Sequence, residues 1–310
     1  MNDVNREPFR VLLATDDSPS ARNAETWVAH ARWPEPCVVD VLCVASHGVG
    51  RRGWPTPSDR SAVSRAIERL RESEVMAAER ISNEVAIRLQ HAGLTTRSWA
   101  RQSEVWTHQG NVASEILATV DLERPDVVVV GPRGRSGLVQ LLLGSVSRRI
   151  IAESRSPVLV ARKPGFVDDQ RLPRGLLVLV DGTRATDSAI DWLISSGWAT
   201  GSRVTLLALL GFPPGVEYDD PELVSQVNLA LQSDAAATLE ELTAHLVSHG
   251  SQVDAMFEQG HPHEAAVRVA SQLEPDAVIV VRPSGQRANE PFAENVARYA
   301  SLSTLVVPEP

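Results

Sequence analysis

Residues Asp126–Ser147 read Asp-Val-Val-Val-Val-Gly-Pro-Arg-Gly-Arg-Ser-Gly-Leu-Val-Gln-Leu-Leu-Leu-Gly-Ser-Val-Ser, and this stretch decides the fold class. Its opening, Val127–Val130, is an unbroken run of β-branched side chains. Such a run is typical of a strand buried on both faces of a parallel sheet. The strand ends at Gly131, where the chain must turn, and we expect a functional site at this turn.

Among the glycines that follow the strand are Gly134, three residues later, and Gly144, immediately before Ser145. Glycines let backbone N–H groups approach an anion without obstruction by a β-carbon. A helix beginning at Gly144 and Ser145 adds unpaired N–H donors and the positive end of its dipole. We therefore predict a phosphate cradle, with the hydroxyls of Ser145 and Ser147 as additional donors.

Tight-turn glycines and an ordinary N-cap serine explain the same residues without any ligand. The spacing Gly-x2-Gly-x9-Gly-Ser favours a ligand-binding loop over that explanation, because it resembles the ATP-binding signature of the universal stress protein family. The stretch is neither a Walker A loop, since no Lys follows its last glycine, nor the dinucleotide motif Gly-x-Gly-x-x-Gly.

The composition indicates a soluble globular protein of two domains, with 310 residues of which 43% are hydrophobic. A net charge of −9 argues against nucleic acid as the main partner. No apolar run approaches the roughly 20 residues that cross a bilayer, and the polar N-terminus is not a secretory signal. We expect a cytoplasmic protein without a membrane segment.

Strands and helices are predicted to alternate along the first half, which implies a parallel sheet with right-handed crossovers. A helix begins near Ser18–Ser20, after Asp16-Asp17. The expected strands are 10–15, 38–45, 94–102, 127–130 and 156–162, and the further helices are 61–92, 112–120 and 146–154. Ligands of such sheets bind outside the carboxyl ends of the strands, which places Asp16 and the Gly131–Gly134 loop in one crevice.

The second half repeats the first. Leu176–Val180 with Asp181 corresponds to the first strand with Asp16, and Pro275-Asp276 corresponds to Pro125-Asp126. The repeat is too long for a solenoid and indicates two copies of one domain. We place them at residues 1–163 and 174–310, with a linker at about 163–174.

The second copy lacks the cradle. Val281 and Ser284 stand at the positions of Gly131 and Gly134, and Pro291, Phe292 and Glu294 fall near the helix start. Valine obstructs backbone approach and a carboxylate repels phosphate. We therefore expect that only the first copy binds a nucleotide.

The resemblance to universal stress proteins covers the whole chain and implies two tandem Rossmann-like α/β domains of the adenine nucleotide alpha hydrolase-like type. Each would hold a five-stranded parallel sheet of order 3-2-1-4-5. It also implies that one ATP, with Mg²⁺ as its companion ion, binds the first domain. The implied binding residues are Ala14, Thr15, Asp16, Val44, Val130, Gly131, Arg133, Gly134, Gly144, Ser145, Val146 and Ser147.

Within that set, the resemblance implies roles for individual residues. Asp16 would lie by the nucleoside, and the backbone of Val44 would face the adenine edge. The glycines and the first residues of the helix at Ser145 would hold the phosphates through N–H groups. Pro132 departs from the pattern by removing one donor, and Arg133 adds a positive charge.

The resemblance also implies pairing of the two domains through their fifth strands, Val158–Ala161 and Leu305–Val307, which covers exposed edges. A homodimer and a further, unidentified protein partner are compatible with it.

No activated nucleophile or base accompanies the cradle, so we expect a sensor or regulatory module rather than an enzyme, and no catalytic residues. His261 and His263 are expected to be surface residues rather than metal ligands. A slow ATPase of the nucleotide alpha hydrolase superfamily and a nucleotide-free protein-interaction module remain the alternatives.

Overall fold

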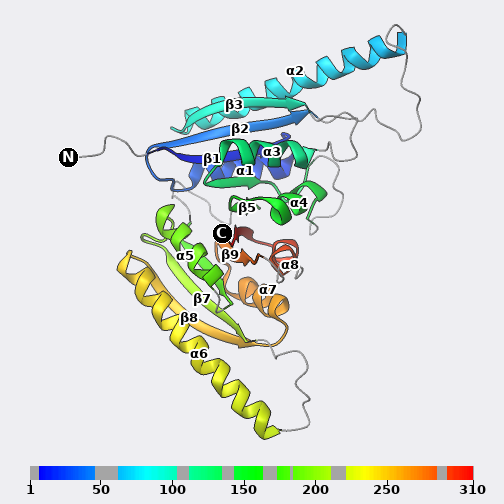
Figure 1. The fold of residues 1–310 in the computed structure, drawn as a ribbon. Coiled ribbons are helices and arrows are strands. Elements are labelled where there is room, and N and C mark those ends of the chain that lie inside the picture. The colour runs from blue at the N-terminus through cyan, green and yellow to red at the C-terminus, as the bar shows by residue number, and fades with distance from the viewer. Residues whose placement is uncertain are drawn as a thin grey trace, which may run out of the picture. The chain divides into compact units, whose positions relative to one another are not determined.

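The computed structural model describes residues 7–45, 62–102, 112–134, 143–162, 173–181, 184–210, 221–284 and 292–309. Close packing divides the chain into two compact units. The first comprises residues 1–29 and 35–158, and the second comprises residues 30–34 and 159–310. Both are built from alternating strands and helices, which can be followed by colour in Figure 1.

The first half contains five strands and four helices. They are β1 (Phe9–Thr15), α1 (Pro19–His30), β2 (Cys37–Ala45), α2 (Ala62–His91), β3 (Thr95–Gln102), α3 (Val112–Glu123), β4 (Val127–Val130), α4 (Ser145–Glu153) and β5 (Val158–Val160).

The strand order of this half is β3-β2-β1-β4-β5. Strand β1 pairs in parallel with β2 on one side and β4 on the other, and β2 pairs in parallel with β3. This confirms the predicted fold class and order. Strand β5 is shorter than the predicted 156–162 and begins later, after a turn at which the Ser154 hydroxyl donates to the carbonyl of Ser156 at 2.7 Å.

Helices cover both faces of this sheet. Helices α1 and α2 lie side by side, where Arg88 donates to Glu25 at 2.6 Å, and α3 and α4 are joined by Arg149 and Ser114 at 2.8 Å. All four residues of β4 are buried, as expected for a strand covered on both faces. Helix α2 runs past the end of β3 (Figure 1).

The second half repeats this pattern. Its elements are β6 (Gly175–Val180), α5 (Arg184–Ser195), β7 (Arg203–Leu210), α6 (Pro221–Ser248), β8 (Gln252–Gln259), α7 (Pro262–Leu273), β9 (Ala277–Arg282), α8 (Phe292–Tyr299) and β10 (Ser303–Pro308). The order β10-β9-β6-β7-β8 is the order of the first half read from the other edge.

Two short pieces of the first half of the sequence group with the second unit. Within that unit, Leu159 and Val160 of β5 lie next to β10. The two fifth strands are therefore neighbours, as expected. Segment 30–34 is held by Arg32, whose guanidinium donates to the carbonyl of Pro173 at 2.6 Å and to the hydroxyl of Ser202 at 2.7 Å. Among the described residues, no helix is both long and apolar enough to span a membrane.

A buried carboxylate ties the first three strands of the first unit together. Asp40 on β2 is only 2% exposed. It accepts hydrogen bonds from Arg97 at 2.6 and 2.8 Å, from Arg10 at 3.1 Å and from the indole N–H of Trp99 at 3.2 Å. Such a charge is tolerated inside a protein only while its partners remain.

Replacing Asp40 by Ala is therefore expected to lower the free energy of unfolding by about 2–4 kcal/mol, because the arginines lose their buried acceptor. Chemical denaturation followed by circular dichroism measures this. Asp254→Ala, at an exposed position of β8, is the matched control and should change stability by less than about 0.5 kcal/mol. Equal stabilities of the two variants would contradict the structural role given to Asp40.

Candidate functional site

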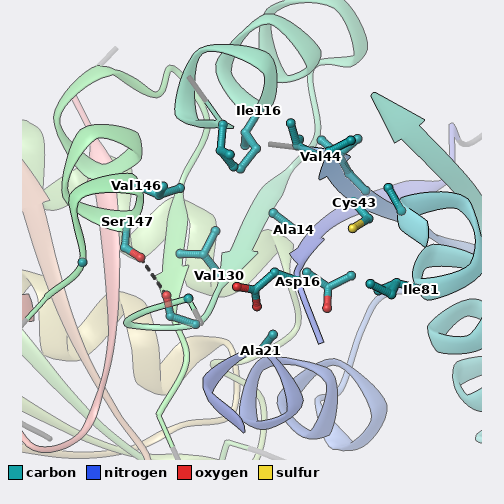
Figure 2. A pocket seen from close by; sticks show the side chains of 18 of the residues that line it. Ala14, Asp16, Ala21, Cys43, Val44, Ile81, Ile116, Val130, Val146 and Ser147 are labelled. Atoms are coloured by element: carbon teal, nitrogen blue, oxygen red, sulfur yellow. Dashed lines mark hydrogen bonds between the residues drawn. The ribbon is translucent and has the colours of Figure 1, made fainter. Parts of the chain in front are cut away.

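A cavity of about 490 Å³ opens at the carboxyl ends of β1, β2 and β4 in the first unit. This is the edge at which parallel sheets bind ligands, close to where the strand order reverses. Helices α2 and α3 and the start of α4 complete its wall. Figure 2 shows Asp16, Val44, Ile116 and Val130 around the open space.

The structure brings the residues singled out by the sequence to this one cavity. Every member of the predicted set lines it: Ala14, Thr15, Asp16, Val44, Val130, Gly131, Arg133, Gly134, Gly144, Ser145, Val146 and Ser147. They come from four separate stretches of the chain. That these residues hold a nucleotide stays a prediction.

The turn after β1 fixes the carboxylate of Asp16. Its Oδ1 accepts the backbone N–H of Ser18 at 3.0 Å, and the hydroxyl of Thr15 accepts the N–H of Asp17 at 3.2 Å. Asp17 has a φ of 58°, a left-handed conformation that Asp tolerates better than most residues. The Ser18 hydroxyl accepts the N–H of Ala21 at 3.2 Å and so caps α1.

Gly131 is required by packing. A β-carbon at this position would lie 2.7 Å from the backbone carbonyl of Ser20 and 3.0 Å from the nitrogen of Ala21. The end of β4 therefore passes so close to the first turn of α1 that no side chain fits between them. This contact explains the glycine without any ligand.

Gly134 and Gly144 are also constrained by the protein. A β-carbon at position 134 would lie 2.6 Å from Asp16 Oδ2, and one at position 144 would lie 3.2 Å from the carbonyl oxygen of Pro132. The N–H of Gly144 donates to that same carbonyl at 2.7 Å. This N–H therefore closes the loop onto Pro132.

The Ser147 hydroxyl has a partner within the protein. It is buried and donates to the carbonyl of Gly131 at 2.7 Å, the dashed line in Figure 2. This hydrogen bond links α4 to the end of β4.

The start of α4 supplies further N–H donors. Gly144 is the N-cap residue, with no side-chain cap, and its carbonyl accepts the first helical bond from Arg148 at 3.0 Å. Residues Ser145, Val146 and Ser147 precede that bond, so their N–H groups have no carbonyl within the helix. All three residues line the cavity, which receives the positive end of the helix dipole.

Part of the wall was not identified from the sequence. Helix α2 contributes Glu74, Ala77, Ala78 and Ile81, and α3 contributes Val112 and Ile116. The α2 residues recur at the spacing i, i+3, i+4, i+7, which marks a helix face turned to the sheet. That spacing does not distinguish packing on the sheet from lining a cavity beside it.

Among the described residues, no group of three or more His, Cys, Asp or Glu side chains is arranged to hold a metal ion.

The strand registers settle which residues correspond in the second half. Leu12 is paired with Val128, and Leu177 is paired with Val278. Continuing both strands places Ser284 at the position of Gly134. The N–H and hydroxyl of Ser284 both donate to the carboxylate of Glu309, at 2.6 and 2.9 Å. A carboxylate of the chain itself thus accepts from both donors of Ser284.

A parallel sheet with a cavity at its carboxyl edge, beside a glycine-containing loop and a helix N-terminus, defines a Rossmann-like α/β protein. Sequence comparison identifies the family within this class. The universal stress protein family matches residues 9–162 and 174–308, and the chain belongs to that family.

Individual relatives agree with this membership. The universal stress protein YxiE of Bacillus subtilis is 28% identical over 161 residues, which cover 49% of this chain and 98% of YxiE. A universal stress protein of Methanocaldococcus jannaschii is 41% identical over 56 residues, 18% of this chain and only 33% of that protein. The fold matches a universal stress protein structure from Archaeoglobus fulgidus with a TM-score of 0.64, at 18% identity over 97% of this chain and 96% of that one.

Gly131→Ala tests the packing role of this glycine. We expect the free energy of unfolding to fall by about 1–3 kcal/mol, because α1 or β4 must shift to admit the methyl group. Gly175→Ala is the control, since a β-carbon there meets its nearest atom at 3.8 Å. If chemical denaturation finds Gly131→Ala as stable as the control, the close approach is not a constraint.

Proposed function

We propose that the first unit binds one ATP per chain and that the protein is a nucleotide-dependent regulatory module with little or no hydrolysis. The observation that carries this proposal is the convergence of the twelve predicted residues on one cavity next to the N-terminus of α4. The cavity volume of about 490 Å³ lies in the range of small-molecule sites.

The chemistry of the wall divides the cavity into two ends. Apolar side chains gather at the β2 side, where Leu42, Ile81 and Ile116 line the space. This end suits a nucleobase, with the Val44 backbone at its edge. The opposite end, at α4, suits phosphates.

At the phosphate end, the backbone N–H groups of Ser145 and Val146 would hold the phosphates together with the Gly131–Gly134 loop. Arg133, which also lines the cavity, supplies a positive charge. Asp16 would accept hydrogen bonds from the ribose between the two ends. Mg²⁺ bound with ATP would neutralise phosphate charge and rely on the phosphates for most of its ligands.

The lining favours binding over turnover. Its carboxylates are Asp16 and Glu74, and it includes no His or Lys among the described residues. Asp16 Oδ1 is already engaged by the N–H of Ser18. A general base must lie within hydrogen-bond reach of the attacking water, and in this proposal Asp16 is assigned to the nucleoside instead.

A nucleotide-free interaction module is the second candidate, because packing within the protein explains the glycines at Gly131 and Gly144 without any ligand. Relatives show what other members bind: one from Arabidopsis thaliana has been solved with AMP bound, and another member has been solved in complex with cAMP. These likenesses have TM-scores of 0.35 and 0.34, so the proposal for this chain rests on its own cavity.

Isothermal titration of the full chain with ATP and Mg²⁺ is expected to give a stoichiometry of one. Gly134→Val and Gly144→Glu should each weaken binding at least about tenfold. Valine at 134 displaces Asp16 or the loop, and glutamate at 144 places a negative charge at the phosphate end. Gly175→Ala, in the second half, should bind like the unchanged protein.

The possible results of these measurements distinguish the proposed function from its two alternatives. No heat from nucleotide-free protein favours the interaction module, and rapid release of phosphate in the same mixture favours an ATPase. Undiminished affinity in both Gly134→Val and Gly144→Glu would refute the site.

A further inference from the structure

Glu74 is the one charged side chain that α2 contributes to the cavity among the described residues. Its neighbours on the same helix face are small or apolar: Ala77, Ala78 and Ile81. The side chain is half-buried. Helical spacing alone would place an apolar residue at position 74, so the carboxylate departs from the pattern around it.

Packing fixes the height of Glu74 along the wall. The next residue, Val75, packs on a cluster that contains Cys43 and Ala45 of β2 together with Ala78 and Ile81. Glu74 therefore lies level with the carboxyl end of β2. Val44, whose backbone is expected to face the nucleobase edge, lines the cavity from that same strand end.

The location of Glu74 separates it from the phosphate end. Helix α2 packs over β2 and β3, whereas the start of α4 follows β4 on the other side of β1. A carboxylate at the α4 end would repel phosphates. At the β2 end it faces the part of a nucleotide that carries hydrogen-bond donors and no charge.

We propose that Glu74 selects the base, by accepting a hydrogen bond from the exocyclic 6-amino group of adenine. This inference rests on the proposed nucleotide site. A carboxylate can only accept hydrogen bonds, so the 6-oxo group of a hypoxanthine nucleotide would set a lone pair against it where the 6-amino group of adenine donates. The site then rejects hypoxanthine nucleotides, which share the shape of adenine nucleotides.

The test compares ATP with ITP, which differs in the 6-oxo group, on the full chain. The unchanged protein should bind ATP more tightly. In Glu74→Gln the amide can both donate and accept, so the ratio of ATP to ITP affinity should fall at least about tenfold, the range of a hydrogen bond to a charged group. Glu72→Gln, an exposed glutamate of the same helix, is the matched control and should keep the original ratio.

A parallel titration with 2′-deoxy-ATP distinguishes the base from the sugar. If Glu74→Gln leaves the ATP to ITP ratio unchanged, the base is read by other groups and the inference is overturned. If that variant changes only the ATP to 2′-deoxy-ATP ratio, the carboxylate faces the ribose and the inference is equally overturned.

Failure of the underlying site looks different, because the unchanged protein would then bind neither ATP nor ITP. Thermal denaturation of the nucleotide-free variants shows whether each has folded. Should Glu74→Gln not fold, Glu74→Asp keeps the charge but withdraws it by one methylene, and a reduced ATP to ITP ratio in that variant supports the inference. An unreduced ratio overturns it.

Discussion

The close approach of β4 to the first turn of α1 is the constraint on which the site depends. Because a β-carbon at Gly131 would lie 2.7 Å from the carbonyl of Ser20, the strand end and the helix start hold one another in place. The same helix start carries the Ser18 cap, and Ser18 in turn orients Asp16. The Ser147 hydroxyl then joins α4 to the carbonyl of Gly131. The polar groups of the cavity are thus positioned by one close approach of two backbones and by hydrogen bonds between side chains and backbone.

Much of this architecture was predictable from the sequence, because buried parallel strands leave a strong pattern. Val127–Val130 was predicted with its observed bounds, and the duplication was visible in the matching of Asp126 with Asp276. The start of the fifth strand was predicted too early, because the turn before it includes a hydroxyl contact of Ser154 that composition does not reveal. The wall formed by α2 was missed because a helix face turned to a cavity has the same spacing as one turned to a core.

The structure also changes the physical meaning of the glycine signature. Sequence reasoning treats each glycine as room for a phosphate, yet Gly131, Gly134 and Gly144 all abut protein atoms. The N–H of Gly144 closes the loop onto Pro132. The N–H groups at the start of α4 lie at the cavity beside the Gly131–Gly134 loop and Arg133, so the glycines serve to hold that helix N-terminus in position.

The contact between Ser284 and Glu309 has a consequence for the duplicated half. An anion attached to the same chain never diffuses away, so any dissolved anion would compete against a neighbour at very high effective concentration. The two donors of Ser284 are satisfied in this way without any dissolved anion. The duplicated half thus fills this one position from its own chain, whereas the corresponding Gly134 of the first half lies at the wall of a cavity.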